Sequence, residues 1–345
     1  MSVIIARTPE KTNKFQFCST NLKPVGKNFL SDYSKSDSKW DEHRSYATTV
    51  ESIYNTEGSP QFQRLSARIR FCSLFLGYNT GHDEDTFELK LKLKTAQFCR
   101  VRTCPVCQWR RSLLWRSRFF NRIQPMLKQP NFEKYRFVFL TLTVKNCSIE
   151  DLRPTIQSMN KAWSRLIQLK ALRHVHGWIR TTEVTRGEDG SAHPHFHCLL
   201  LVPSTYFGGQ AYVTQEKWTD YWMQSMRIDY TPIVHIQTVK AKKSTDGQKI
   251  SLNERMIAAA CETLKYSVKE ADLVKDPAWL VEYTKQAYKL RFIATGGILK
   301  DILGNEDQQT DQELIHVDDN ADPMASPDAD LYFLWSKQAS RYVKV

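Results

Sequence analysis

Three histidines at alternate positions, in His193–Pro194–His195–Phe196–His197, constrain the fold of this chain more than any other feature. The apolar run Cys198–Val202 follows at once, so a buried β-strand is predicted over residues 193–202. Alternate side chains of a strand point to one face, so the three imidazoles project together. Neutral imidazole is the commonest protein ligand for metals. The pattern predicts metal or phosphate chemistry; the alternative is a solvated strand, or core histidines satisfied by backbone.

A carboxylate in the preceding predicted strand can join these histidines. Glu183 lies in the middle of Trp178–Thr185, and the turn Arg186–Ser191 makes the two strands a hairpin. Opposed residues of antiparallel strands have numbers with a constant sum, so Glu183 shares the histidine face only if the loop has an odd number of residues. Gly190 can supply the positive φ of a three- or five-residue loop. A two-residue loop would leave Glu183 as an ordinary solvated carboxylate.

The cysteines indicate a second metal site. Cys104 and Cys107 form a Cys-x-x-Cys knuckle, and Cys99 supplies a third sulfur five residues earlier. Cys72 is the nearest remaining cysteine and completes a four-thiolate zinc site, with His82 as the rival fourth ligand. A redox Cys-x-x-Cys is the alternative, but it usually opens a helix after a thioredoxin-type strand.

The charge balance points to nucleic acid. The net charge of the 345-residue chain is +12, although residues 305–330 contain nine acidic residues and no Lys or Arg. The rest of the chain is therefore more basic still, which favours a polyanionic partner. Trp109–Ile123 predicts a helix with an apolar and a cationic side, where arginine and tryptophan suit a phosphate backbone or a stacked base. The candidate DNA-contacting residues here are Arg102, Trp109, Arg110 and Arg111.

The remaining elements follow from periodicity. Further strands are predicted over residues 87–95, 136–145 and 232–240, and further helices over 63–75, 150–172, 215–226 and 276–290. A capping box, Ser251–Glu254, starts a helix that runs to about residue 270. Its apolar face is Ile257, Cys261, Leu264 and Val268. Its other face carries Glu262, Lys265, Tyr266 and Lys269, which taken alone is plain surface.

The predicted organisation has four parts. Residues 1–60 form a flexible lead-in, 61–130 a zinc-binding and basic segment, 131–304 the main α+β domain, and 305–345 an acidic, disordered tail. No run approaches the length needed to span a bilayer, and no secretory signal is evident, so a cytoplasmic protein without membrane contact is expected.

Four motifs in order resemble plasmid rolling-circle replication initiators (Rep proteins) of the HUH endonuclease superfamily. They are Cys99 with Cys104–Arg111, then Phe139–Thr143, then His193–His197, then Lys265–Lys269. The resemblance covers roughly residues 65–300. It implies an HUH fold, a five-stranded antiparallel sheet flanked by helices, with an appended zinc-binding segment.

The resemblance also implies roles for individual residues. His195 and His197, with Glu183, would hold a divalent ion, Mg²⁺ or Mn²⁺. Tyr266 would attack single-stranded origin DNA and form a 5′-phosphotyrosyl intermediate with a free 3′-hydroxyl. Glu262 stands where some relatives have a second tyrosine and would activate water; Lys269 and Lys265 would hold phosphate, with His193 near DNA. Single- and double-stranded origin DNA, a host helicase and a polymerase are the implied partners.

Three alternatives remain open. A histidine-triad nucleotide hydrolase also uses alternating histidines, with His195 as nucleophile, but it has no role for the knuckle or for Tyr266. A non-catalytic zinc DNA-binding protein could carry a structural histidine strand. A conjugative relaxase or single-strand transposase of the same superfamily is also possible.

Overall fold

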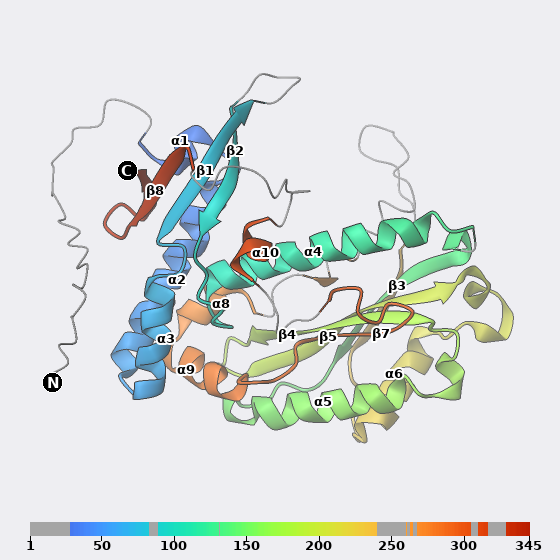
Figure 1. The fold of residues 1–345 in the computed structure, drawn as a ribbon. Coiled ribbons are helices and arrows are strands. Elements are labelled where there is room, and N and C mark those ends of the chain that lie inside the picture. Colours follow the sequence, from blue (N-terminus) through green and yellow to red (C-terminus); the bar gives the residue numbers. More distant parts are fainter. Residues whose placement is uncertain are drawn as a thin grey trace, which may run out of the picture.

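A five-stranded antiparallel sheet in the order β6-β3-β5-β4-β7 forms the centre of the computed structural model (Figure 1). The structure describes residues 28–82, 89–130, 132–239, 260, 263–264, 268–304, 310–316 and 329–345. The strands of this sheet are β3 (Tyr135–Thr143), β4 (Gly177–Arg186), β5 (Ala192–Pro203), β6 (Val234–Thr238) and β7 (Ile293–Gly297). The predicted α+β class with this sheet is confirmed.

The two faces of the sheet are covered by different helices. Even-numbered side chains of β3 and β5, such as Leu140 and Leu200, pack beneath α5 (Leu152–Leu166) and α6 (Gln215–Met226). Odd-numbered ones, such as Phe137 and Leu199, pack toward α4 (Pro105–Leu127) on the opposite side (Figure 1). β5 is apolar on both faces because both are covered, which explains its unbroken hydrophobic run.

A second, four-stranded antiparallel sheet in the order β2-β1-β8-β9 was not predicted. It combines β1 (Phe75–His82) and β2 (Leu89–Ala96) with β8 (Leu331–Ser336) and β9 (Arg341–Lys344). Residues 331–345 therefore do not form a disordered tail: Phe333, Trp335 and Tyr342 are buried. The prediction missed this short, aromatic hairpin because it extended the disorder expected of the acidic residues 305–330 to the end of the chain.

The predicted flexible lead-in is also wrong over its described part. α1 (Leu30–Tyr33) is followed by α2 (Ser38–Glu57), which is buried through Trp40, Ala47, Val50 and Tyr54 at helical spacing. α2 packs against α3 (Pro60–Arg70), and α2 also contacts β9 of the second sheet. The remaining helices are α8 (Glu270–Lys275), α9 (Pro277–Gln286) and α10 (Asp311–Ile315).

Among the residues that the structure describes, no helix combines the length and apolarity required to cross a membrane.

Candidate functional site

The hairpin β4–β5 positions the predicted His/Glu cluster. Glu183 is paired with His195 in the register, and Arg186 with Ala192. The connecting loop, residues 187–191, has five residues, and Gly190 adopts φ +84°. The loop therefore has an odd number of residues, which is the condition stated from the sequence, and Glu183 lies on the face of His195 and His197.

Three potential ligand atoms converge at this face. His195 Nε2 lies 3.1 Å from His197 Nε2, and Glu183 Oε2 lies 3.0 Å from His197 Nε2 and 3.5 Å from His195 Nε2. Ligand atoms about 2.1 Å from an ion and at right angles to one another lie about 3.0 Å apart. The spacing fits one divalent cation held by two imidazoles and a carboxylate, with further positions open to a substrate.

The other ring nitrogens have partners that orient the imidazoles. His195 Nδ1 lies 3.2 Å from the carbonyl oxygen of His193, and His197 Nδ1 lies 3.3 Å from Thr141 Oγ1. A carbonyl oxygen only accepts, so His195 Nδ1 carries the proton and its Nε2 keeps a lone pair for a metal. The sequence analysis did not identify Thr141 as a residue of this site. Its position in the alternating pattern of the predicted strand 136–145 could have indicated it.

His193 does not join the cluster. Its Nδ1 lies 2.7 Å from Asn146 Oδ1, and burial lowers the pKa of its imidazole. The three imidazoles of the motif therefore divide into two potential ligands and one flanking residue.

The electrostatics of Glu183 favour its charged form. Burial by itself raises the pKa of this carboxyl group, but hydrogen bonds with His195 and His197 outweigh it and leave the pKa well below its ordinary value. Glu183 is thus a carboxylate at neutral pH, as a metal ligand must be.

The segment with the predicted nucleophile is described only in part. Glu262, Lys265 and Tyr266 lie outside the described residues, as do Ile257 and Cys261. Leu264 and Val268 of the predicted apolar face are buried, whereas Lys269 is exposed and directly precedes α8.

One contact attaches this segment to the sheet. Thr181 Oγ1 donates to the carbonyl oxygen of Thr263 at 3.0 Å, and Thr181 is paired with His197 in the register. Directly opposed residues share a face, so Thr263 lies on the face of the His/Glu cluster. Tyr266 follows Thr263 by three residues in the chain.

Two of the predicted DNA-contacting residues are buried, so they are not available to DNA. Trp109 is 7% exposed and Arg110 5% exposed. Arg110 donates to the carbonyl oxygens of Leu314 and Ile315 at 2.9 and 3.0 Å, which joins α4 to α10. The tryptophan–arginine pattern at the start of α4 therefore serves packing, and this part of the prediction is wrong.

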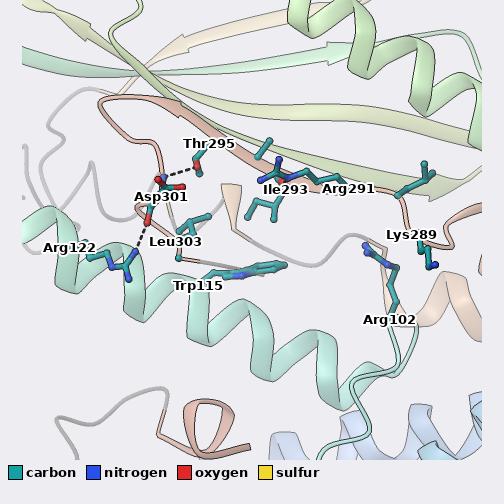
Figure 2. A pocket seen from close by; sticks show the side chains of 12 residues that line it. Arg102, Trp115, Arg122, Lys289, Arg291, Ile293, Thr295, Asp301 and Leu303 are labelled. Atoms are coloured by element: carbon teal, nitrogen blue, oxygen red, sulfur yellow. Dashed lines mark hydrogen bonds between the residues drawn. The ribbon is translucent and has the colours of Figure 1, made fainter. Parts of the chain in front are cut away.

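The other two candidate DNA-contacting residues, Arg111 and Arg102, lie apart from each other. Arg111 is half-buried; hydrogen bonds with Cys104, Cys72 and Cys99 are the main cause of the lowered pKa of the Cys107 thiol, and the charge of Arg111 adds to it. Arg102 lines a pocket between α4 and the segment that leads into β7, and its guanidinium group lies 4.8 Å from the ring centroid of Phe292 (Figure 2).

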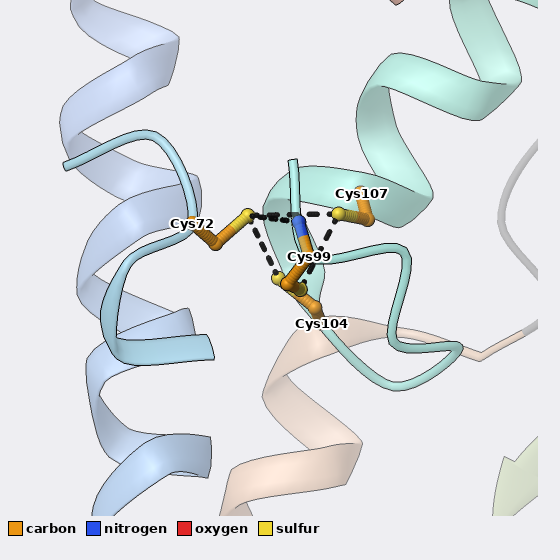
Figure 3. A group of neighbouring side chains, drawn as sticks. All are labelled: Cys72, Cys99, Cys104 and Cys107. Atoms are coloured by element: carbon orange, nitrogen blue, oxygen red, sulfur yellow. Dashed lines mark hydrogen bonds between the residues drawn. The ribbon is translucent and has the colours of Figure 1, made fainter. Parts of the chain in front are cut away.

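The four predicted cysteines form a buried cluster at the N-terminus of α4 (Figure 3). The Sγ atoms of Cys72 and Cys107 lie 3.6 Å apart, those of Cys99 and Cys107 3.6 Å, and those of Cys104 and Cys72 3.7 Å. A tetrahedral ion with sulfurs at about 2.3 Å sets sulfur–sulfur separations of about 3.8 Å. The geometry fits a four-thiolate zinc site, with Cys72 as the fourth member; His82 is exposed at the end of β1.

Backbone amides complete this cluster. The amide of Arg100 donates to Cys107 Sγ at 3.3 Å and that of Val101 to Cys99 Sγ at 3.4 Å. Hydrogen bonds from the neighbouring thiols hold the pKa of Cys107 well below its usual value. At Cys107 the surroundings therefore stabilise thiolate, the form that binds metal, whereas the hydrogen bond with Cys104 raises the pKa of Cys72 and burial raises that of Cys99.

The fold and these sites define an α+β protein with a two-histidine, one-carboxylate site on an antiparallel sheet and a separate four-cysteine cluster. A family model described as "Replication protein" matches residues 90–343, and the chain belongs to this family. This confirms the resemblance to plasmid replication initiators at the level of the family.

Several curated relatives are named "Protein rep". One from Bacillus amyloliquefaciens is 34% identical over 317 residues, 86% of this chain and 90% of the relative. One from Lactiplantibacillus plantarum is 39% identical over 242 residues, which cover 66% of this chain and 73% of the relative. One from Streptococcus pneumoniae is 32% identical over 262 residues, which cover 73% of this chain and 77% of the relative. No solved structure matches the chain.

Proposed function

We propose that this protein initiates rolling-circle replication by nicking one strand of plasmid origin DNA through Tyr266. The observation that carries the proposal is the convergence of His195, His197 and Glu183 on one point of the sheet, on the face that Thr263 contacts. Family membership and the basic charge support DNA as the substrate.

The proposed reaction has two steps, the cleavage of the DNA strand and the release of the protein. Tyr266 Oη attacks a phosphorus atom of single-stranded DNA, the bond from phosphorus to the 3′ oxygen breaks, and the 3′-hydroxyl leaves. Lys269 and Lys265 hold the phosphate and favour the tyrosinate. Glu262 then directs a water at the phosphotyrosine, which releases the protein. A free 3′-hydroxyl is the end that a host polymerase extends, and a host helicase would separate the strands.

Two metals belong to the proposal. Mg²⁺ or Mn²⁺ held by His195, His197 and Glu183 would polarise the scissile phosphate when bound. Zn²⁺ held by the four-cysteine cluster would be structural and would fix the N-terminus of α4. The first set offers nitrogen and oxygen ligands with open positions and the second only sulfur, so the two sites differ in the ions they prefer.

The nicking activity is tested with the full-length protein, Mn²⁺ and a labelled single-stranded oligonucleotide that covers the plasmid origin. The wild-type protein and the control Tyr288→Phe, an exposed tyrosine just after α9, should form an adduct that survives denaturation. Tyr266→Phe should form none. An adduct with Tyr266→Phe would falsify the assigned nucleophile, and hydrolysis of dinucleotides without any adduct would favour the histidine-triad alternative.

The role of Glu262 needs a separate readout. Glu262→Ala should leave cleavage nearly intact and slow the release of the protein from DNA. If the adduct of Glu262→Ala disappears as fast as that of the wild type, the water-activating role is wrong.

A further inference from the structure

A basic pocket separates α4 from the chain around β7 (Figure 2). Its volume is about 910 Å³. Residues Lys289–Arg291 and Ile293–Thr295 form one wall, and Trp115 and Arg122 of α4 form the other. We refer to it as the α4–β7 pocket.

Positive charge dominates the described lining of the α4–β7 pocket. Arg102, Arg122, Lys289 and Arg291 contribute cations, against one acidic residue, Asp301. Arg122 donates to the main-chain carbonyl oxygen of Asp301, and Arg291 Nε donates to that of Ile293 at 3.1 Å. A carbonyl oxygen orients a guanidinium group without neutralising it, so these two side chains are held in place with their charge available to an anion.

The pocket also has an aromatic wall. The ring of Trp115 lies flat along α4, facing the space between the two walls (Figure 2). Trp115 is only half-buried, although it packs against the core cluster around Phe137 and Ile179. A supported aromatic ring among cations is the combination that binds single-stranded nucleic acid, since the ring stacks on a base while the cations track the backbone. Duplex DNA offers no free base face.

The pocket opens on the same face of the sheet as the His/Glu cluster. Ile293 of the pocket is paired with Thr181, and Thr181 with His197. Adjacent strands lie about 4.8 Å apart, so this row spans about 10 Å from β7 to β5. A DNA strand that runs from the cluster to the pocket passes beside Thr263, which is bonded to Thr181 in the middle of this row.

We propose that the α4–β7 pocket binds the single-stranded DNA next to the scissile phosphate, with a base stacked on Trp115 and backbone phosphates on Arg122, Lys289 and Arg291. This subsite rests on the proposed nicking function for its biological meaning, but its binding chemistry is independent of the tyrosine. It fixes which stretch of the strand is held while the neighbouring phosphate reacts.

The subsite is tested by fluorescence anisotropy with full-length, zinc-containing protein, without added Mg²⁺ or Mn²⁺ and without a chelator, and a labelled oligo(dT) of about 20 nucleotides, longer than one binding fold requires. Trp115→Ala should weaken binding about tenfold, and Trp115→Phe should restore most of it. Lys289→Ala should reduce the dependence of log K on log[salt] by about 0.7, the value of one single-strand phosphate contact. Lys161→Ala, an exposed lysine on α5 across the sheet, is the matched control and should bind as the wild type does.

A second probe separates stacking from charge. Inorganic polyphosphate carries the charges without bases, so Lys289→Ala should weaken its binding while Trp115→Ala should not. If Trp115→Ala weakens both probes equally, Trp115 only shapes the pocket and the stacking assignment is wrong. Circular dichroism of each variant verifies folding, and the exposed Lys289→Glu provides a charge reversal that does not disturb the core.

Failure of the subsite and failure of the nicking proposal give different results. If Trp115→Ala and Lys289→Glu both bind oligo(dT) as tightly as the wild type, the subsite is refuted, whatever the nicking assay shows. If these variants lose binding while the wild-type protein forms no adduct with origin DNA, the subsite stands and the nicking proposal fails.

Discussion

Glu183 and His195 face each other across the β4–β5 hairpin, and Glu183 Oε2 lies 3.5 Å from His195 Nε2. The two residues are directly paired in the register, and a five-residue loop connects their strands. The loop length decides this relationship. A change of one residue in the register would turn Glu183 to the face that packs on α5 and α6. The geometry of the His/Glu cluster is therefore encoded in a turn that contributes no ligand.

Replacing Glu183 by Gln should weaken divalent-ion binding about 100-fold or more, because loss of an outer partner of a ligand alone costs about 10- to 100-fold. The amide keeps the shape but removes the negative charge between the two imidazoles. Calorimetric titration with Mn²⁺ measures the loss, and Glu216→Gln, exposed on α6, is the control. Unchanged Mn²⁺ affinity in Glu183→Gln would exclude the carboxylate as a ligand.

Thr181→Val should slow nicking about fivefold while leaving Mn²⁺ affinity unchanged. Valine matches the shape of threonine but cannot donate to the Thr263 carbonyl oxygen, and a hydrogen bond of about 1 kcal/mol is lost. The segment that carries Tyr266 would then be less well fixed on the sheet. Thr181→Ser should recover the rate; if it nicks no faster than Thr181→Val, the hydroxyl does not position the segment.

Cys72→Ser should abolish binding of one zinc ion per chain and lower Tm by about 10 °C or more, because metal binding at such a site contributes directly to folding. Cys147→Ser, a half-buried cysteine outside the cluster, should keep both the ion and the Tm of the wild type. Zinc content by atomic absorption and thermal unfolding followed by circular dichroism provide the readouts. A full zinc complement in Cys72→Ser would return His82 to consideration as the fourth ligand.

Glu51→Gln should destabilise the protein by about 1–3 kcal/mol at pH 7 and by much less at pH 3. The buried Glu51 carboxylate accepts from Lys337 Nζ at 2.7 Å and from Arg70 Nε at 3.0 Å. Burial raises its pKa, but these hydrogen bonds outweigh burial and lower the pKa below its ordinary value. A lowered folded-state pKa gives stability that is present above the unfolded value of about 4.3 and is lost as the pH falls through the folded one.

Urea unfolding of the wild type and Glu51→Gln across this pH range measures the difference. Glu42→Gln, exposed on the same helix, is the control. A gap between wild type and Glu51→Gln that stays constant down to pH 3 would contradict the assigned ion pairs.

The His/Glu cluster could be predicted because its determinants are local. The alternation of His195 and His197 and the parity of the loop before them depend on a stretch of about 15 residues. Cys72 was predictable for a different reason: few cysteines are present, and tetrahedral thiolate sites need four. Both arguments use chemistry that does not depend on the rest of the fold.

The N-terminal helix α2 could not be predicted in this way. Its buried side includes His43, Arg44 and Glu51, which read as solvated residues in the sequence. Each has a partner far away in the chain: His43 bonds to Glu270 at 2.7 Å, Arg44 donates to the Arg70 carbonyl oxygen at 2.8 Å, and Glu51 accepts from Lys337. Arg110 misled the prediction for the same reason, since its acceptors are about 200 residues away in the chain.

The pairing of β1 with β8, and of β8 with β9, has a consequence for the order of events during synthesis. The N-terminal strands leave the ribosome early, but their sheet stays incomplete until residue 344 has emerged. Contacts so distant in sequence form late, because loop closure must precede them. In the central sheet, β3, β4 and β5 pair with one another and all precede β8 in the chain, so these three strands are not delayed in this way. Ribosome-bound chains that end before β8 should therefore expose the edge of β1 and be cut there by proteases, while β3–β5 are already protected.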